Sequence, residues 1–142
     1  MFDGNEQRLP VVIRSVRRED AEAWERMRSD MWPDGRQDHG PEIAAFFAGT
    51  LEEPEAVLVA ENAAGQLVGV AELSIHTDLP SRVGQRVGYV EGLYVVPYAR
   101  RRGVARSLLM ASREWGREHG CTGIASDRAG RMVFDRSYER RA

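Results

Sequence analysis

Residues 95–105 read VVPYARRRGVA: the end of an apolar run, a loop with three consecutive arginines, and the start of a long amphipathic stretch. Apolar residues recur at three- and four-residue spacing over 104–118, which predicts a helix. The first N–H groups of a helix lack partners within the helix, and the helix dipole makes that end electropositive. A strand that leads through this loop into a helix therefore predicts a cradle for an anion such as a pyrophosphate.

Each residue type in the loop suits that role. Arg100, Arg101 and Arg102 supply full positive charges, Gly103 lets the backbone come close to an anion, and Ala105 keeps the next turn open. The loop is not a Walker A motif, which needs Gly-Lys-Ser/Thr, and it lacks the glycine pattern of dinucleotide-binding folds. A chance surface loop of the same composition is the alternative.

On either side of this loop the chain reads as a mixture of strands and helices, which places it in the α+β class. Strands are expected at 11–16, 56–61, 66–76, 87–96 and 121–126, and helices at 19–31, 41–51 and 104–118. Gly92, inside the fourth strand, indicates a bulge or a close approach of another group to the backbone. Met132 and Phe134 indicate one more short strand near the C-terminus.

Length and composition exclude several protein classes. The 142 residues suit one domain, so residues 1–142 are expected to form a single domain. No run of 18 apolar residues exists, which excludes a transmembrane helix. Cys121 is the only cysteine, which excludes a disulfide or a cysteine-based zinc site within one chain. Because the polar start MFDGNEQRLP is not a signal peptide, a cytoplasmic location is expected.

The charge is unevenly distributed along the chain. All 20 basic residues are arginine; residues 1–97 hold 9 of them against 17 acids, and residues 98–142 hold 11 against 5 acids. The acidic excess is sharpest over 19–61, with 12 acids against 3 arginines. The C-terminal part should therefore prefer an anion and the N-terminal part a cation, unless these are simply solvated helix faces. A chain of net charge −2 whose acidic residues concentrate in the N-terminal part is a poor general nucleic-acid binder.

The arginine loop carries a family resemblance. Arg100-x-x-Gly103-x-Ala105, after a strand that ends Leu93-Tyr94-Val95-Val96, resembles the acetyl-CoA signature of the GNAT N-acetyltransferase superfamily. Four further motifs occur in order over 11–127 and together resemble bacterial aminoglycoside 6′-N-acetyltransferases. They are Met31-Trp32-Pro33-Asp34, Val90-Glu91-Gly92-Leu93-Tyr94-Val95, Trp115-Gly116 with Gly120-Cys121, and Ala125-Ser126-Asp127.

The resemblance implies a fold, a cosubstrate and an activity. The fold would be a central mixed, mostly antiparallel sheet flanked by helices, and the activity would be transfer of an acetyl group from acetyl-CoA to an aminoglycoside amine, the 6′ amine, giving antibiotic resistance. No metal is implied. The residues implied to bind acetyl-CoA are Leu93, Tyr94, Val95, Arg100, Arg101, Arg102, Gly103, Val104 and Ala105.

The resemblance also implies an acceptor pocket lined by Trp32, Glu91 and Asp127. An ammonium cannot attack a thioester, so a carboxylate must first take its proton. Asp127 is the first choice for this base and Glu91 for orienting the amine. A backbone N–H near Leu93 to Val95 would stabilise the oxyanion.

Structural explanations of these residues stay open. Glu91, Leu93 and Val95 are expected to share one strand face, where Glu91 would be either a site residue or a buried partner of an arginine. Asp127 would otherwise be a turn residue and Trp32 a core aromatic, as Trp24 and Trp115 are expected to be. The three histidines, His39, His76 and His119, have no metal-binding spacing and are expected on the surface or in turns.

The resemblance fails after Asp127. The family continues with an Asn/Ser-rich loop, a helix and a Leu-Gly-Phe turn, none of which occurs here; residues 131–136 instead resemble the family's final strand, as though a helix and a strand were deleted. Tyr138 could be the general acid, but no positional argument supports it. The sheet edge beside 121–126 is expected to be exposed and to pair with a second copy, which predicts a homodimer. A GNAT enzyme for another small amine or polyamine, or an inactive remnant, are the alternative functions.

Overall fold

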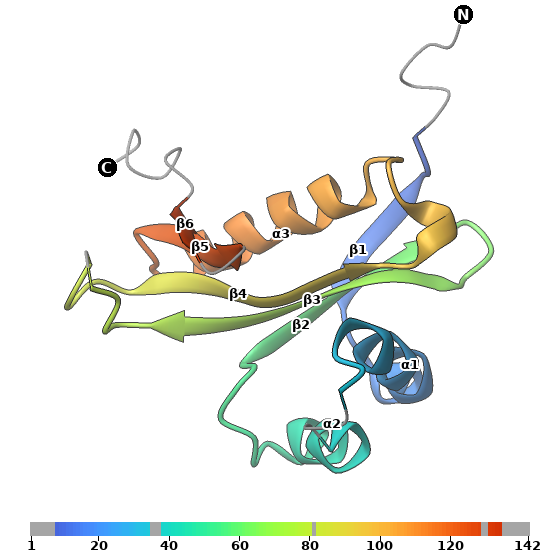
Figure 1. The fold of residues 1–142 in the computed structure, drawn as a ribbon, viewed down its shortest axis with the longest axis horizontal. Helices are drawn as coiled ribbons and strands as arrows, with labels where there is room; N and C mark the ends of the chain where they lie inside the picture. Colours follow the sequence, from blue (N-terminus) through green and yellow to red (C-terminus); the bar gives the residue numbers. More distant parts are fainter. Residues whose placement is uncertain (1–7, 35–37, 81, 129–130, 135–142) are drawn as a thin grey trace, which may run out of the picture.

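The structure is a computed structural model that describes residues 8–34, 38–80, 82–128 and 131–134. Helices cover both faces of one six-stranded sheet, with α3 on one face and α1 and α2 on the other (Figure 1). The elements are β1 (Val11–Ser15), the 3-10 turn η1 (Arg18–Asp20), α1 (Ala21–Met31), α2 (His39–Ala48), β2 (Ala56–Asn62), β3 (Leu67–His76), β4 (Val87–Val95), the 3-10 turn η2 (Pro97–Ala99), α3 (Val104–Glu118), β5 (Gly123–Arg128) and β6 (Arg131–Phe134).

Most element boundaries follow the sequence pattern, and the exceptions have local causes. α3 begins and ends where its amphipathic pattern does. α2 ends earlier than expected, at Ala48, because Gly49 adopts a left-handed conformation with φ of 75° and terminates the helix. β5 begins later than expected because the amide of Cys121 still donates to the carbonyl of Gly116, at 2.9 Å, and so completes the end of α3.

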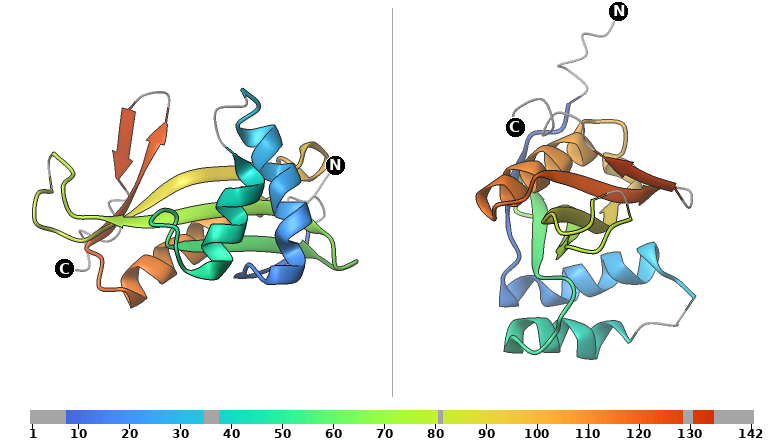
Figure 2. Two further views of the ribbon diagram at one scale, coloured as in Figure 1. Left: turned by 90° about the horizontal axis from the view of Figure 1, so that it is seen from below. Right: turned by 90° about the vertical axis from the view of Figure 1, so that its left-hand side faces the viewer.

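The strands lie in chain order across the sheet, β1-β2-β3-β4-β5-β6, and every neighbouring pair is antiparallel except β4 and β5. The parallel pairing of β4 with β5 is short, from Val87 opposite Gly123 to Val90 opposite Ser126. Beyond Val90, β4 continues to Val95 beside β3 alone. Figure 2 shows β5 and β6 turning away from this second half of β4. The sheet is therefore split open along one edge of β4.

A bulge interrupts β4 at the start of this opening. Glu72 of β3 lies opposite Gly92 and Leu73 lies opposite Val90, so Glu91 is an extra residue with no partner of its own. The expectation that Glu91, Leu93 and Val95 share a face is therefore wrong, because the bulge reverses the alternation after Val90. The bulge expected at Gly92 is confirmed.

Two apolar clusters hold the helices to the sheet. On the α3 face, Leu73, Val104 and Leu108 belong to a cluster of buried residues against which Leu93 packs. On the other face Trp24 is fully buried, and the rings of Phe46 and Phe47 pack edge-on against it with centroids 5.2 and 5.9 Å away. The core role expected of Trp24 is confirmed.

The end of the chain departs from expectation. β6 pairs antiparallel with β5, from Ala125 opposite Phe134 to Arg128 opposite Arg131. The outer edge of β5 is therefore covered, and the expectation of an exposed edge there is wrong: a four-residue strand closes back on β5. Only residues 129–130 join the two strands, which leaves no room for a helix between them. Among the described residues, no helix is long and apolar enough to cross a membrane.

Candidate active site

The split beside β4 exposes backbone groups rather than side chains. The amide of Val96 donates to the carbonyl of Val68 on β3, at 2.9 Å. Successive residues of a strand direct their N–H and C=O groups to opposite edges. Leu93 and Val95 therefore direct theirs away from β3, toward the edge where β5 has turned away. This edge can pair with an extended ligand or donate an N–H to an oxyanion.

The arginine loop closes one end of the split. Gly103 has φ of 87°, a left-handed conformation that disfavours a side chain, and it immediately precedes α3. The amide of Leu9 donates to the carbonyl of Arg102, at 3.0 Å, and ties the loop to the segment before β1. The amides of Val104 and Ala105 begin the helix and have no partner inside it. The loop and the helix end therefore lie together at the place where the sequence predicts an anion cradle.

The three arginines of the loop differ in their contacts and in their exposure. The Nε atom of Arg100 donates to the carbonyl of Val95, at 2.7 Å, and its guanidinium lies 5.3 Å from the centre of the Tyr94 ring. Arg100 thus braces the loop against β4. Arg101, which has a left-handed φ of 64°, is exposed like Arg100, whereas Arg102 is half-buried.

Two other residues expected to bind the cosubstrate face elsewhere. The hydroxyl of Tyr94 donates to Asp30 of α1, at 3.2 Å, and its backbone has the same orientation as that of Val96, toward β3. Burial, followed by the nearby Asp30 carboxylate, raises the pKa of Tyr94. The side chain of Val104 is buried in the α3 cluster, so only its amide is available at the loop.

Trp32 packs against the bulge of β4 on the face of the sheet away from α3. A Cβ atom on Gly92 would come within 2.8 Å of Cη2 of Trp32, so the absence of a side chain at Gly92 is what lets the indole pack there. The guanidinium of Arg28 lies 5.2 Å from the centre of the Trp32 ring. The structure thus brings Trp32 next to the residue that precedes Gly92, Glu91.

The side chain of Glu91 meets a histidine at the end of β3. Its Oε1 lies 2.7 Å from Nε2 of His76, whose ring packs edge-on against Tyr89, with centroids 4.8 Å apart. A Cβ on Gly88, the neighbour of Tyr89, would face Gly116 of α3, so Tyr89, His76 and Glu91 lie on the side of the sheet away from α3. This is the face on which Trp32 lies.

His76 is surrounded by acids, which the sequence did not indicate. Besides Glu91, Glu53 lies 3.8 Å from Nε2 and Asp78 lies 3.8 Å from Nδ1. Burial is the largest influence and lowers the pKa of His76, but the hydrogen bond and charge of Glu91, with the charges of Glu53 and Asp78, outweigh it and raise the pKa above 6.5. The expectation that His76 is a simple surface or turn histidine is wrong.

Distance alone would allow a metal ion between Glu53, His76 and Glu91, whose ligand atoms lie within 4.8 Å of one another. Ligands about 2.0–2.1 Å from a tetrahedral zinc stand roughly 3.3 Å apart. The 2.7 Å between His76 and Glu91 is shorter and is the length of a charge-assisted hydrogen bond. His76 and Glu91 are therefore hydrogen-bonded to each other rather than spaced to hold a zinc ion.

A buried ion pair fixes the helix that carries Trp32. Glu72 is 1% exposed and accepts from Nε1 of Trp24, at 2.9 Å, and from Nε and Nη2 of Arg28, at 2.7 and 3.2 Å. Arg28 also donates to Glu42 of α2. Burial lowers the pKa of Arg28, but the contacts with Glu72 and then Glu42 raise that pKa by more than burial lowers it. The guanidinium therefore stays charged. Glu72 rather than Glu91 is thus the buried partner of an arginine; its place within the apolar run VGVAELSI was the signal for it.

The strand pairing places the backbone of Asp127 beside the split. Because Val90 and Ser126 form the last pair of β4 with β5, Glu91 and Asp127 are the next residues on the two sides of the split. The backbone of Asp127 pairs with Met132 of β6. Its side chain, and Tyr138 altogether, lie outside the part of the chain that the structure describes.

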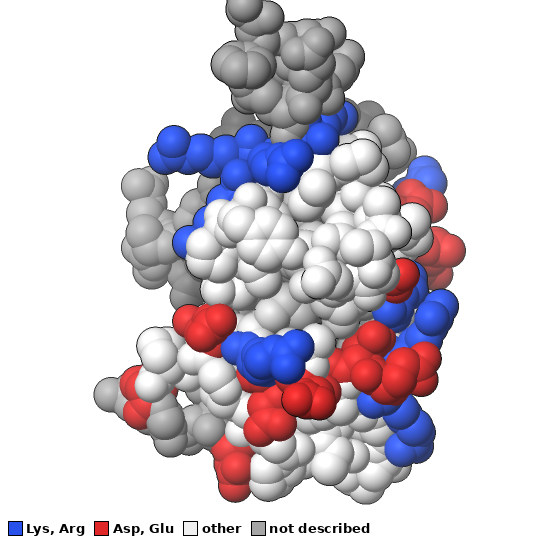
Figure 3. All heavy atoms as spheres, turned by 90° about the vertical axis from the view of Figure 1, so that its right-hand side faces the viewer, with Lys and Arg blue, Asp and Glu red and all other residues white. Residues whose placement is uncertain are grey.

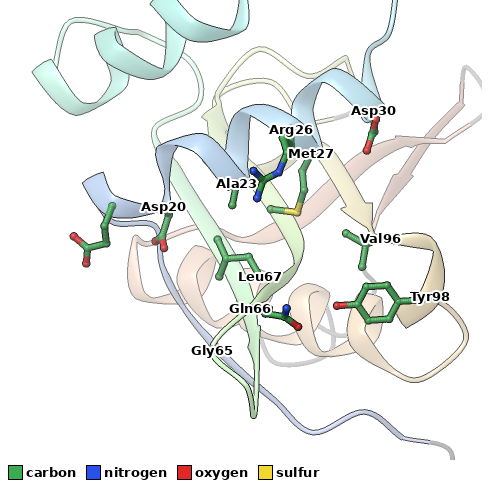
Figure 4. A pocket seen from close by; sticks show the side chains of 11 residues that line it. Asp20, Ala23, Arg26, Met27, Asp30, Gly65, Gln66, Leu67, Val96 and Tyr98 are labelled. Carbon is green, nitrogen blue, oxygen red and sulfur yellow. The ribbon is translucent and has the colours of Figure 1, made fainter.

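A hollow of about 470 Å³ lies beside α1 but apart from these residues (Figure 4). Its lining comes from α1, the β2–β3 turn and the start of η2, and includes Asp20, Arg26, Asp30, Gln66 and Tyr98. Neither Glu91, Trp32 nor the arginine loop lines it. Asp20 is committed to Arg14, 2.7 Å away, whose hydrogen bond lowers the pKa of that carboxyl. The split beside β4, and not this hollow, is the candidate active site.

The uneven charge of the sequence is visible on the surface. Figure 3 shows one group of basic side chains at the top of one face, on the α3 side, and acidic side chains mainly in its lower half, toward α1 and α2, where further basic side chains lie among them. An anionic ligand at the arginine loop and a cationic one near α1 and α2 would each meet a favourable potential.

Comparisons with known proteins agree with this geometry. The profile of the Acetyltransferase (GNAT) family matches residues 21–132. An aminoglycoside N(6′)-acetyltransferase type 1 of Klebsiella aerogenes is 44% identical over 117 residues, which cover 82% of this chain and 77% of that protein. Its counterpart from Stenotrophomonas maltophilia is 37% identical over 117 residues, 82% of this chain and 74% of that protein.

Solved structures are similar over most of the chain. Aminoglycoside N-acetyltransferase AAC(6′)-Iy in complex with CoA superimposes with a TM-score of 0.73 and 27% identity, over 94% of this chain and 84% of that one. The same enzyme with the bisubstrate analogue CoA-S-monomethyl-acetylneamine gives a TM-score of 0.73 and 31% identity, over 84% and 80% of the two chains.

Proposed function

The chain belongs to the acetyltransferase (GNAT) family, and from this premise we propose that it transfers the acetyl group of acetyl-CoA to the 6′ amine of an aminoglycoside and so confers antibiotic resistance. The observation that carries the proposal is the 44% identity to an aminoglycoside N(6′)-acetyltransferase over a span that includes both the arginine loop and the bulge at Glu91. Residues 1–142 act as one catalytic domain in this proposal.

Acetyl-CoA is the cosubstrate, and the residues at the split suit it. The amides of Gly103, Val104 and Ala105 receive its pyrophosphate, with Arg101 and Arg102 adding charge. The pantetheine arm contains amides and pairs with the edge of β4 at Leu93 and at the amide of Val95, whose carbonyl accepts from Arg100, as an added strand does. This arrangement directs the thioester toward the bulge.

Acyl transfer needs a neutral amine, a stabilised oxyanion and a protonated leaving group. Asp127 takes the proton from the substrate ammonium, and Glu91 orients the amine. The amine nitrogen then bonds to the carbonyl carbon while an N–H from the Leu93–Val95 edge holds the oxyanion. The nitrogen loses its second proton to water, the C–S bond breaks, and water or an unassigned acid protonates the thiolate.

The acidic residues over 19–61 support a polycationic acceptor. Aminoglycosides carry several ammonium groups, and an acidic wall raises their local concentration by electrostatic steering. Trp32 adds a flat apolar surface against which a sugar ring can lie. Another small amine or polyamine would meet the same wall and is the second candidate acceptor. The short β5–β6 connection favours an inactive remnant as the third reading.

The assembly and location of the enzyme are also proposals. A homodimer would pair the outer edge of β6, now the last strand of the sheet, with its copy. Sedimentation at micromolar concentration checks this, because a monomer mass contradicts it. A lone cysteine suits a reducing compartment, which supports a cytoplasmic location.

The first test is isothermal titration with acetyl-CoA, followed by a thiol-release assay with tobramycin or kanamycin. Thiol release with these drugs, and none with an aminoglycoside that carries a hydroxyl in place of the 6′ amine, is the expected result. Release with spermidine alone would support the second candidate. No binding at millimolar acetyl-CoA would show that the split beside β4 does not hold its ligand.

A further inference from the structure

Glu91 occupies a position at which no pairing with β3 fixes it. As the extra residue of the bulge it has no partner residue on β3, and a glutamate side chain has three rotatable bonds to order. Its carboxylate is nevertheless fixed, because Oε1 lies 2.7 Å from Nε2 of His76. The pair joins residues 15 positions apart in the chain, from the end of β3 and the middle of β4.

The surroundings of His76 make its proton important for the charge of the pocket. The groups that face it are Glu53 from before β2, Asp78 from the loop after β3, and Tyr89 and Glu91 from β4. Glu55 is engaged by the amide of the preceding residue, Ile75. A proton on His76 neutralises one of three surrounding carboxylates, at the end of the acceptor pocket where an ammonium must bind.

We propose that His76 is a positioning residue for the acceptor amine, which holds the Glu91 carboxylate at the bulge and competes with the substrate ammonium for it when protonated. Neutral His76 keeps Glu91 in place through one hydrogen bond and leaves the carboxylate charge for the amine. Protonated His76 forms an ion pair with Glu91, and the ammonium must displace it. The raised pKa of His76 shifts this change to higher pH than in an ordinary histidine. The inference rests on the proposed function, because it takes an aminoglycoside as the acceptor.

Two variants distinguish the positioning of Glu91 by His76 from the competition of protonated His76 with the substrate ammonium. His76→Gln keeps an amide donor near the position of Nε2 but does not titrate, and His76→Ala removes both properties. His119→Gln is the control, because His119 lies at the end of α3. Among the contacts that the structure gives its ring are a hydrogen bond with the carbonyl of Trp115 and packing against the Trp115 ring, and none involves the site. KM and kcat for tobramycin are measured at pH 6 and pH 8.5, and each is divided by the wild-type value so that titration of the drug cancels.

We expect His76→Gln to lower the KM for tobramycin about threefold at pH 6 and to leave it unchanged at pH 8.5, with kcat little altered. His76→Ala should raise KM at both pH values, because Glu91 loses its support. His119→Gln should match the wild type. Identical behaviour of the Gln and Ala variants, or a wild-type pH dependence that survives in His76→Gln, would overturn the proposal.

A binding measurement keeps this test separate from the proposed function. The chain has three histidines, so their ring signals can be titrated by NMR and the His76 signal assigned from its loss in His76→Gln. Glu91→Gln should lower the pKa of His76, and so should saturating tobramycin. No effect of either would contradict the His76 proposal. Absence of thiol release with every aminoglycoside would instead contradict the proposed function, whatever the coupling between His76 and Glu91.

Discussion

The two sides of the split beside β4 are built differently. The side proposed to hold acetyl-CoA presents backbone groups: the start of α3, the edge of β4 at Leu93 and Val95, and the loop at Gly103. The side proposed to hold the amine presents side chains from α1, β3 and β4, aligned by a buried ion pair and a bulge. Backbone sites are specified by local conformation, whereas side-chain sites depend on contacts between distant segments. Substitutions should therefore disturb the two sides independently.

The largest effect is expected on the acceptor side, at Glu72. Glu72→Leu leaves the buried guanidinium of Arg28 without its main partner, and breaking a buried pair in this way costs about 3–5 kcal/mol of the free energy of unfolding. Urea unfolding measures the loss. Glu42→Gln is the control, because Glu42 is 35% exposed and should cost less than about 1 kcal/mol. A loss as small as the control's would mean that Arg28 finds a substitute partner and that the pair does not fix α1.

Gly92 should give the next largest effect. A Cβ there would lie 2.8 Å from Cη2 of Trp32 and 3.0 Å from Cε of Met31, so Gly92→Ala forces the end of α1 away. Overpacking of this kind costs about 1–3 kcal/mol. We expect a higher KM for tobramycin and an unchanged KM for acetyl-CoA.

Gly88→Ala is the matched control on the same strand, because the nearest atom to its Cβ would be 3.7 Å away, in ordinary contact. An increase in the KM for acetyl-CoA equal to that for tobramycin in Gly92→Ala would break the distinction between the two sides of the split.

How far the sequence reveals each side follows from the same difference. The arginine loop, Gly103 and α3 lie within one continuous stretch, so propensity and spacing predict them. The bond of Arg28 to Glu72 spans 44 residues, and no local pattern connects the two. The bulge shifts the strand alternation by one residue, which is why Glu91 does not share a face with Leu93 and Val95 as expected. The pairing of β6 with β5 depends on where a four-residue strand settles against the sheet, which propensity does not determine.

The cosubstrate side should respond to Gly103. With φ of 87° at this residue, Gly103→Ala costs about 1–2 kcal/mol and disturbs the loop, although the nearest side-chain atom, Cγ of Arg8, is 3.8 Å from the new Cβ. We expect a higher KM for acetyl-CoA with the KM for tobramycin unchanged. Gly65→Ala, at φ of 81° in the β2–β3 turn with open space around it, should lose similar stability and keep both KM values. If Gly65→Ala also weakened acetyl-CoA, the effect would reflect general stability.

The smallest effect should come from the exposed charge of Arg101, and its neighbour provides the comparison. Arg101→Met removes a charge at the cradle without a packing cost, so we expect the KM for acetyl-CoA to rise about threefold at low salt and stability to stay constant. Added salt should reduce the difference, because it screens exposed charges. Arg100→Met instead removes the donor to Val95 and should lower stability by about 1 kcal/mol, with a change in KM that salt does not reduce. If both variants showed the same salt dependence, Arg100 would act as a ligand charge and not as a brace, and the cosubstrate side would then rely on side chains as the acceptor side does.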